Sequence, residues 1–293
     1  MIDNSLVVCA DIGGTHITTA IVDVIKKTIL PGTTVRERVD SHAVATEIIN
    51  TWSKAIMRSA ANGSVDKLSL AMPGPFDYEK GVSLIHGQAK YESIYKLNVK
   101  ELLADKLGFE KENISLINDA ASFLQGEAFA GSAAGFGRAV GITLGTGLGS
   151  CIFENRVAVD AGLWQMPFRE GIAEDYLCTR WFVNRYRELT GEEIRGVKEL
   201  LAIENTSVVE QVFNEFGDCL SEFLQMFISI SKPEVVVIGG NIAKAYEYFK
   251  PALNPVLNKL FPKVPIKIAQ LGEDAALLGA ASYWDTRHAL PVT

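Results

Sequence analysis

The sequence lacks the features that define several large classes of protein. Its 293 residues include four cysteines, none with C-x-x-C spacing, which argues against a disulfide framework and against a local zinc knuckle. There is no apolar run of about 18 residues, and the N-terminus does not read as a secretory signal. We therefore expect a cytoplasmic protein without a membrane span, in which Cys9, Cys151, Cys178 and Cys219 are buried thiols.

Basic side chains are too few and too scattered for a nucleic-acid-binding surface. The formal net charge is −7 and no dense Lys/Arg segment occurs, so we expect no nucleic acid as a partner. An anionic ligand would then need a local site. The phosphate-binding pattern G-x-x-x-x-G-K-[ST] is also absent, which excludes a P-loop protein.

The sequence does contain alternating strand-like and helix-like segments. Residues 5–12 and 18–24 read as strands around a turn, 43–62 have helical spacing, and 171–231 are mainly helical. A buried strand at 233–239 then leads into another helix. This alternation, with 48% hydrophobic and 22% charged residues, predicts a globular α/β protein.

Two glycine-rich strand-turn-strand segments stand at corresponding places in the two halves of the chain. They are "ADIGGTHITTAIVD", with Gly13, Gly14 and Thr15 at its tip, and "GITLGTGLGSCIFE", with Gly145, Thr146 and Gly147. Glycine permits positive φ and lets backbone N–H groups approach a phosphate, while Asp11 could hold Mg²⁺ directly or through water. A pair of tight turns without a ligand is the alternative for either segment alone.

A second pair of polar residues follows an apolar strand. Asn118 and Asp119 end "SLIND" just before a helix, and ligands of open α/β sheets bind outside the carboxyl ends of strands. Asp119 is therefore a candidate general base for a substrate hydroxyl, with a helix cap as the alternative.

Two turns are further candidates for lining a ligand site. Gly239, Gly240 and Asn241 lie between a buried strand and a helix, where bare backbone could face an adenine ring or serve close packing. Pro73 and Gly74, in "AMPGPFD", form a rigid turn that could line a pocket or only reverse the chain.

These segments, taken in order, resemble the ROK family of sugar kinases and repressors, within the actin/hexokinase-like superfamily. The resemblance is carried by "DIGGT" at 11–15, "PGPFD" at 73–77, "ND" at 118–119, "TLGTGLGS" at 143–150 and "VIGGN" at 237–241. It implies Asp119 as the general base and Asp11 as the residue that positions Mg²⁺. The residues that it implies around ATP are Asp11, Gly13, Gly14, Thr15, Gly145, Thr146, Gly147, Gly239, Gly240 and Asn241.

The chain departs from the family pattern after the second glycine hairpin. Family members usually have G-E-x-G-H and then a cysteine cluster that binds zinc with that histidine, whereas this chain reads "DAGLWQMPFREGIAEDYLCTRW". We therefore expect no zinc site. Gln165 aligns with the family histidine and Glu174 with a sugar-contacting Glu; the alternative for Glu174 is a charge at a helix N-terminus. The residues implied around the sugar are Pro73, Gly74, Asn118, Asp119, Gln165 and Glu174.

The resemblance implies a two-lobed actin/hexokinase-like (ribonuclease H-like) α/β fold with an inter-lobe ATP/sugar cleft. The small lobe is expected at 1–117, joined by a C-terminal helix at about 276–293, and the large lobe at 118–275. The implied activity is ATP- and Mg²⁺-dependent phosphorylation of a hexose, most simply glucose, by a homodimer. An N-acetylmannosamine kinase, a fructokinase and a non-catalytic sugar sensor are the alternatives.

Overall fold

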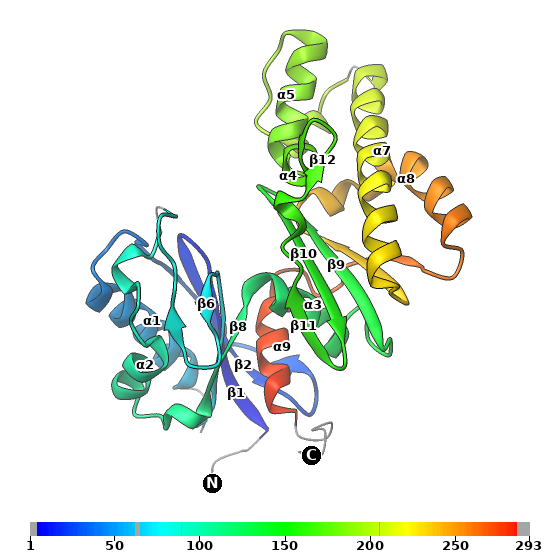
Figure 1. Cartoon of the computed structure of the whole chain (residues 1–293). Coiled ribbons are helices and arrows are strands. Elements are labelled where there is room, and N and C mark those ends of the chain that lie inside the picture. The colour runs from blue at the N-terminus through cyan, green and yellow to red at the C-terminus, as the bar shows by residue number, and fades with distance from the viewer. Residues whose placement is uncertain (1–4, 62–64, 89, 205, 286–293) are drawn as a thin grey trace. The chain divides into compact units, whose positions relative to one another are not determined.

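The computed structural model describes residues 5–61, 65–88, 90–204 and 206–285 (Figure 1). The chain forms two compact units. The first unit comprises the chain up to Gly131 and from Glu273 onward, and the second comprises Ser132–Gly272. Each unit is built on its own mixed β-sheet and is described by itself.

The first unit contains a sheet with the order β3-β2-β1-β5-β8, in which β4 also pairs with β2. Strands β1 and β2 form an antiparallel hairpin, and β1, β5 and β8 run parallel to one another. The carboxyl ends of these three strands therefore meet at one edge of the sheet. The strands are β1 (Leu6–Ile12), β2 (His16–Asp23), β3 (Thr28–Ile29), β4 (Val35–Arg38), β5 (Leu68–Met72) and β8 (Ile114–Asn118).

Helices cover both faces of this sheet, which explains why β1 is an almost continuous apolar run. The face that includes Ala10 packs on α1 and α2, while Ser69, on the other face, accepts a hydrogen bond from the Trp284 indole after α9 (2.9 Å). The helices are α1 (Ala45–Ala60), α2 (Val99–Leu107), α3 (Asp119–Ala130) and α9 (Ala275–Ala281). The unit also contains the small hairpin β6 (Phe76–Asp77) and β7 (Val82–Ser83), and the 3₁₀ turns η1 (Glu92–Ile94), η2 (Lys111–Asn113) and η6 (Ser282–Trp284).

Helices α3 and α9 touch through their backbones, and glycine makes this approach possible. A Cβ at Gly126 would overlap the Ala275 carbonyl, and a Cβ at Gly279 would overlap the Ser122 carbonyl. Since α3 packs against α9 so closely, it belongs to the first unit, whereas the sequence placed the lobe boundary before it, at residue 117. The expected helix at 276–293 is observed as α9 and η6, and its last part, 286–293, lies outside the described residues.

The second unit repeats the strand arrangement of the first. Its sheet has the order β11-β10-β9-β14-β15, with a β9–β10 hairpin followed by parallel strands β14 and β15, so β9 corresponds to β1. The strands are β9 (Arg138–Leu144), β10 (Leu148–Glu154), β11 (Val157–Asp160), β14 (Val235–Gly239) and β15 (Ile266–Ile268). The two glycine hairpins of the sequence are thus equivalent elements of two similar sheets.

A mainly helical segment packs on the second sheet, as the pattern of 171–231 predicts. Its aromatic core includes Phe182, Phe216 and Phe249, all fully buried. The helices are α4 (Ala173–Tyr176), α5 (Thr179–Thr190), α6 (Val197–Leu200), α7 (Thr206–Ser231) and α8 (Tyr246–Leu260). Shorter elements are η3 (Leu163–Gln165), β12 (Pro167–Phe168), β13 (Gly171–Ile172), η4 (Ile242–Ala245) and η5 (Gly272–Asp274), the last at the boundary of the two units.

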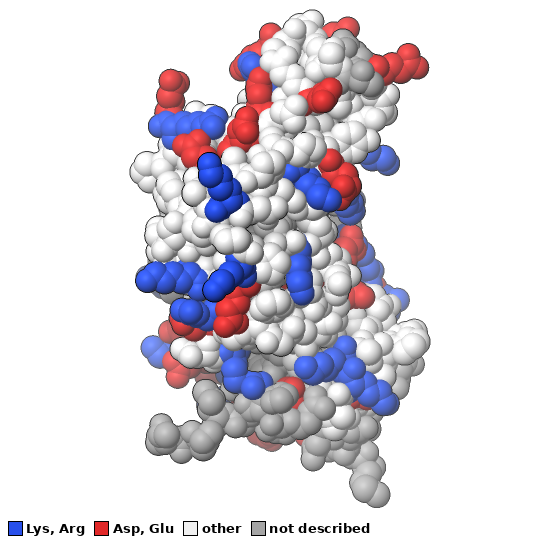
Figure 2. All heavy atoms as spheres, turned by 90° about the vertical axis from the view of Figure 1, so that its right-hand side faces the viewer, with Lys and Arg blue, Asp and Glu red and all other residues white. Residues whose placement is uncertain are grey.

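In the described part of the chain, no helix is both long and apolar enough to cross a membrane. On the face shown in Figure 2, acidic and basic side chains are interspersed, and the described residues there form no continuous basic surface. This distribution agrees with the low number of Lys and Arg residues in the sequence. All four cysteines are free and buried, as expected.

Candidate functional site

The first glycine hairpin has a short tip whose peptide groups are held by specific hydrogen bonds. The Gly13 N–H donates to the His16 carbonyl (2.9 Å), and the Thr15 carbonyl accepts from the Val39 N–H (2.8 Å). The Gly13 carbonyl accepts from the Tyr91 hydroxyl (2.5 Å). Gly13 and Thr15 are exposed, so the tip is accessible to a ligand within its own unit.

The tip glycines of both hairpins lie outside the left-handed region, so the positive φ that glycine permits is not used there. The space around these positions explains the presence of glycine better than backbone conformation does. Nothing lies within 4 Å of a Cβ built at Gly14 or Gly145, whereas a Cβ at Gly147 would come within 2.5 Å of the Glu174 carboxylate. Glycine therefore keeps the tips open and, at Gly147, admits a neighbouring side chain.

Two carboxylates lie at the carboxyl-terminal edge of the first sheet. Asp11 is the penultimate residue of β1 and is partly buried, while Asp119 follows β8 directly and is exposed. Burial and then the negative charge of Asp119 raise the pKa of Asp11 from 3.8 to about 6, against an opposing effect of the Arg36 guanidinium. Oxygen ligands of this kind suit Mg²⁺, which would relieve the repulsion between the two carboxylates.

Asn118, rather than Asp119, caps helix α3. Its Oδ1 accepts the Ala121 N–H (3.0 Å), and its Nδ2 donates to the Tyr78 hydroxyl (3.0 Å), which donates in turn to the Met72 carbonyl (3.1 Å). Asp119 accepts the Ala120 N–H (2.8 Å). The cap that we weighed against a catalytic role thus falls on Asn118, and the exposed carboxylate is that of Asp119.

The turn after β5 lies beside the Asn118 side chain. Pro73 is buried, and a Cβ on Gly74 would stand 3.0 Å from the Tyr78 hydroxyl and 3.6 Å from Asn118 Nδ2. Gly74 is therefore needed for the close approach of this turn to the strand ends. The structure brings Gly74 and Asn118 together, as the sequence predicts for residues around one substrate.

In the second unit, the hairpin tip and the turn at 239–241 are neighbours. Gly240 has a φ of +86° and lies against the backbone of Leu144, the last residue of β9, where a Cβ would overlap the Leu144 carbonyl. Gly239 pairs with Thr143 across β14 and β9. Exposed Asn241 accepts a hydrogen bond from the Lys244 ammonium (2.9 Å). The two segments assigned to ATP in this unit thus lie side by side.

Glu174 also lies at the second hairpin. Its carboxylate accepts the N–H of Leu148 (3.0 Å), the first residue of β10. Glu174 is in the first turn of the four-residue helix α4, which would also favour its charge at that position. Gln165 is exposed in η3, in a segment tied to β10 by a hydrogen bond from the Leu163 N–H to the Ser150 hydroxyl (2.9 Å).

The sequence did not indicate three polar side chains that form hydrogen bonds with candidate site residues. Tyr78 supports Asn118, Tyr91 supports Gly13, and Thr179 donates to the Gly145 carbonyl from both its N–H (2.7 Å) and its hydroxyl (2.8 Å). Tyr78 could have been noticed, since it immediately follows "PGPFD". Tyr91 and Thr179 are far from their partners in sequence and carry no local signal.

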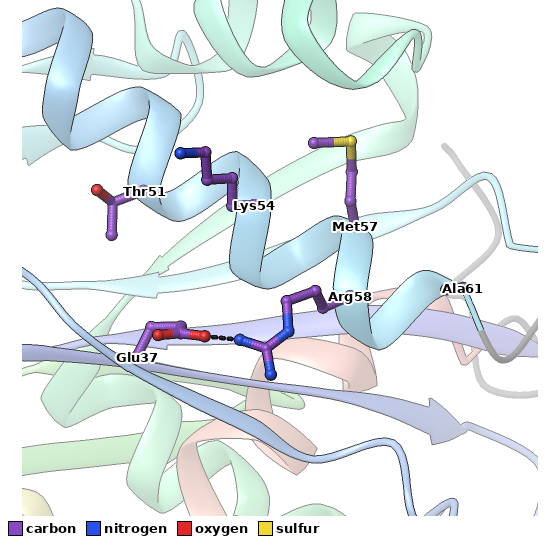
Figure 3. Close-up of a pocket in the computed structure, with 6 residues that line it drawn as sticks. All are labelled: Glu37, Thr51, Lys54, Met57, Arg58 and Ala61. Atoms are coloured by element: carbon purple, nitrogen blue, oxygen red, sulfur yellow. Dashed lines mark ion pairs between the residues drawn. The ribbon is translucent and has the colours of Figure 1, made fainter.

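Two further observations concern sites elsewhere. A pocket of about 440 Å³ lies between α1 and β4 and is lined by Glu37, Thr51, Lys54, Met57, Arg58 and Ala61 (Figure 3). Its Glu37 and Arg58 form an ion pair with each other, and it contains none of the predicted site residues.

Among the described residues, no group of three or more His, Cys, Asp or Glu side chains is arranged to hold a metal ion.

The chain is similar in sequence to known sugar kinases. The sequence model of the ROK family matches residues 7–162 and 169–287, and the short gap falls on η3 and β12, where the chain departs from the family pattern. A glucokinase from Thermotoga maritima is 24% identical over 80% of this chain and 84% of its own length. An N-acetyl-D-glucosamine kinase from Mannheimia succiniciproducens is 27% identical over 82% and 86%.

A solved structure confirms the fold. The glucokinase from Streptomyces griseus, determined in complex with glucose and AMPPNP, superposes with a TM-score of 0.75 at 21% identity, over 95% of this chain and 98% of that one. The α/β actin/hexokinase-like fold expected from the sequence is therefore correct.

Proposed function

Since the chain belongs to the ROK family, we propose that it is an ATP-dependent sugar kinase, which transfers a phosphoryl group from ATP to a sugar hydroxyl. The observation that carries this proposal is the pair of carboxylates, Asp11 and Asp119, at the ends of parallel strands beside an open glycine tip. Phosphoryl transfer needs such an arrangement of a base, a metal-binding carboxylate and phosphate-facing amides.

Asp119 acts as the general base in this mechanism. Its exposed carboxylate accepts the proton of the attacking sugar hydroxyl while the Ala120 N–H holds one of its oxygens. Asn118 has one amide hydrogen and part of its oxygen's accepting capacity left after its bonds to Tyr78 and Ala121, and these groups bind a neighbouring hydroxyl. Gly74 lets the turn after β5 lie close to Asn118 and Tyr78, and we assign this turn to the edge of the sugar site.

Asp11 and the glycine tips bind the nucleotide. The residues that would hold Mg²⁺ are Asp11 and water molecules, and the bound ion would neutralise charge on the transferred phosphoryl group. The N–H groups of Gly13 and Gly145 are bonded within their hairpins, so other backbone N–H groups of the tips bind phosphate oxygens, and the turn at 239–241 binds the adenosine. Glu174 and Gln165 we assign to the sugar, with Glu174 also supporting the second tip through Leu148.

We propose glucose as the acceptor, because the chain is similar to a glucokinase over most of its length. An N-acetylated hexosamine is the second candidate, favoured by the similarity to an N-acetyl-D-glucosamine kinase. We also propose that the protein works as a homodimer in the cytoplasm, where ATP is available.

A sugar panel tests the proposal. ADP release with Mg²⁺ and ATP would be measured with glucose, mannose, fructose, N-acetylglucosamine and N-acetylmannosamine, beside calorimetric titration of each sugar. We expect turnover that depends on one hexose and is lost without Mg²⁺. Binding of a sugar without phosphorylation of any would instead identify a sensor and refute the kinase assignment.

A further inference from the structure

The two glycine tips share a feature that neither sequence motif reveals. In each hairpin, the carbonyl of the first tip glycine accepts a hydrogen bond from a side chain outside the hairpin. Gly13 is bound by the Tyr91 hydroxyl (2.5 Å), and Gly145 by both the hydroxyl (2.8 Å) and the N–H (2.7 Å) of Thr179. Gly13 and Gly145 follow the equivalent strands β1 and β9, so two unrelated side chains serve the same peptide group.

Binding this carbonyl fixes the direction of the next N–H. A trans peptide is planar, and its C=O and N–H point in opposite directions. Because the Gly13 carbonyl points at Tyr91, the Gly14 N–H must point away from it, and the same holds for the Thr146 N–H relative to Thr179. Apart from the adjoining residues of the chain, no described residue has an atom within 4 Å of a Cβ built at Gly14 or Gly145, so an anion has room beside these glycines.

The surroundings of Tyr91 suit this role. Its side chain is fully buried, its ring packs edge-on against Trp52 with centroids 5.4 Å apart, and its N–H donates to the Ser41 carbonyl (2.7 Å). Burial raises the pKa of the phenol, which therefore remains a hydrogen-bond donor at any physiological pH. Tyr91 also has a φ of +56°, in the left-handed region that residues with a Cβ rarely adopt.

We propose that Tyr91 and Thr179 are positioning residues that aim the Gly14 and Thr146 amides at the phosphates of the nucleotide. This inference rests on the proposed kinase function. It also predicts that removing the Tyr91 hydroxyl has the larger effect. Gly13 then loses its hydrogen bond from Tyr91, whereas Gly145 keeps the hydrogen bond from the Thr179 N–H when the Thr179 hydroxyl is removed.

The test compares three substitutions that each remove one hydroxyl: Tyr91→Phe, Thr179→Val and the control Tyr186→Phe. Tyr186 is a buried tyrosine of α5 that donates to Glu192 (3.1 Å) and has no place in the proposed site. Dissociation constants for Mg²⁺–ADP would be measured by calorimetry, KM values for ATP and for the accepted sugar by kinetics, and thermal stability on the same samples.

We expect Tyr91→Phe to weaken Mg²⁺–ADP binding and raise the KM for ATP by about 3- to 10-fold, the loss typical of one hydrogen bond, with the sugar KM unchanged. Thr179→Val should weaken nucleotide binding less than Tyr91→Phe, and Tyr186→Phe not at all. With Mg²⁺–ADP bound, hydrogen exchange should accelerate at the Gly14 amide of Tyr91→Phe relative to wild type, while the β1–β2 pairing stays protected.

Two results would overturn the inference alone. One is wild-type nucleotide affinity in Tyr91→Phe, and the other is an equal loss in Tyr186→Phe, which would show a general effect of stability. A wild-type protein that binds no nucleotide and phosphorylates no sugar would instead overturn the kinase function, and the positioning role with it.

Discussion

The Asp119→Asn substitution tests catalysis separately from binding. Asparagine keeps the size of the side chain and an oxygen that can accept the Ala120 N–H, but it cannot take up the hydroxyl proton. Loss of a general base should lower kcat about 10²- to 10⁴-fold. Binding of the sugar should persist, because Asn118 and its bonds to Tyr78 and Ala121 are untouched.

The expected effect of Asp119→Asn on stability is small and can be worked out from its position. Asp119 is the first residue of α3, where a negative charge gains at most about 1 kcal/mol from the helix dipole. The same charge is repelled by Asp11, which offsets part of that gain. The free energy of unfolding should therefore change by less than about 1 kcal/mol, far too little to explain the loss of turnover.

A second readout does not depend on activity. Since the negative charge of Asp119 raises the pKa of Asp11, its removal should lower that pKa from its value of about 6. Carbon NMR titration of metal-free protein would measure this, with Asp105→Asn on α2 as the control. Turnover near the wild-type rate would refute the role of Asp119 as base, and an unchanged Asp11 pKa would refute the electrostatic coupling of the two carboxylates.

Three further predictions follow from the same geometry. Glu174→Ala should raise the sugar KM several-fold, and the ATP KM should rise with it because the Leu148 amide loses its acceptor; a rise in the ATP KM alone would limit Glu174 to the hairpin. Without Mg²⁺, the contribution of Asp11 to stability should fall as pH rises from about 4 to about 6, since folded Asp11 holds its proton longer than unfolded Asp11; the difference in urea stability between wild type and Asp11→Asn should therefore fall by at most about 3 kcal/mol over this range, and a constant difference would contradict the raised pKa. Gly279→Ala should lower the free energy of unfolding by at least about 1–3 kcal/mol, because its Cβ would overlap the Ser122 carbonyl, and unchanged stability would contradict the described packing.

Local patterns were sufficient to predict the two hairpins and the strand that ends at Asn118. Each consists of apolar strands interrupted by glycine, threonine or acidic residues, so the periodicity and its interruption lie within about ten residues. The boundaries of the first unit depend on contacts between residues that are far apart in the sequence, which local patterns do not show. Helix α3 joins that unit through Gly126 and Gly279, and the partners of these glycines are residues more than a hundred positions away in the chain.

The same distance in sequence explains what was missed at the site. Asp11 and Asp119 were candidates because each follows an apolar strand, and the resemblance to the ROK family then implied their roles. Tyr91 and Thr179 are ordinary residues of a loop and a helix until the fold places them on glycine carbonyls 78 and 34 positions away.

Residues that carry chemistry can therefore be found by their type, whereas residues that orient them are found by their contacts. Under the proposed function, Glu174 would belong to both groups. Its alignment suggests a sugar ligand, and its hydrogen bond to Leu148 connects it to the second glycine tip. A single carboxylate with both contacts would make the stability of the phosphate-binding tip depend on the sugar-binding segment. The Glu174→Ala kinetics, read on both substrates, decide whether that dependence exists.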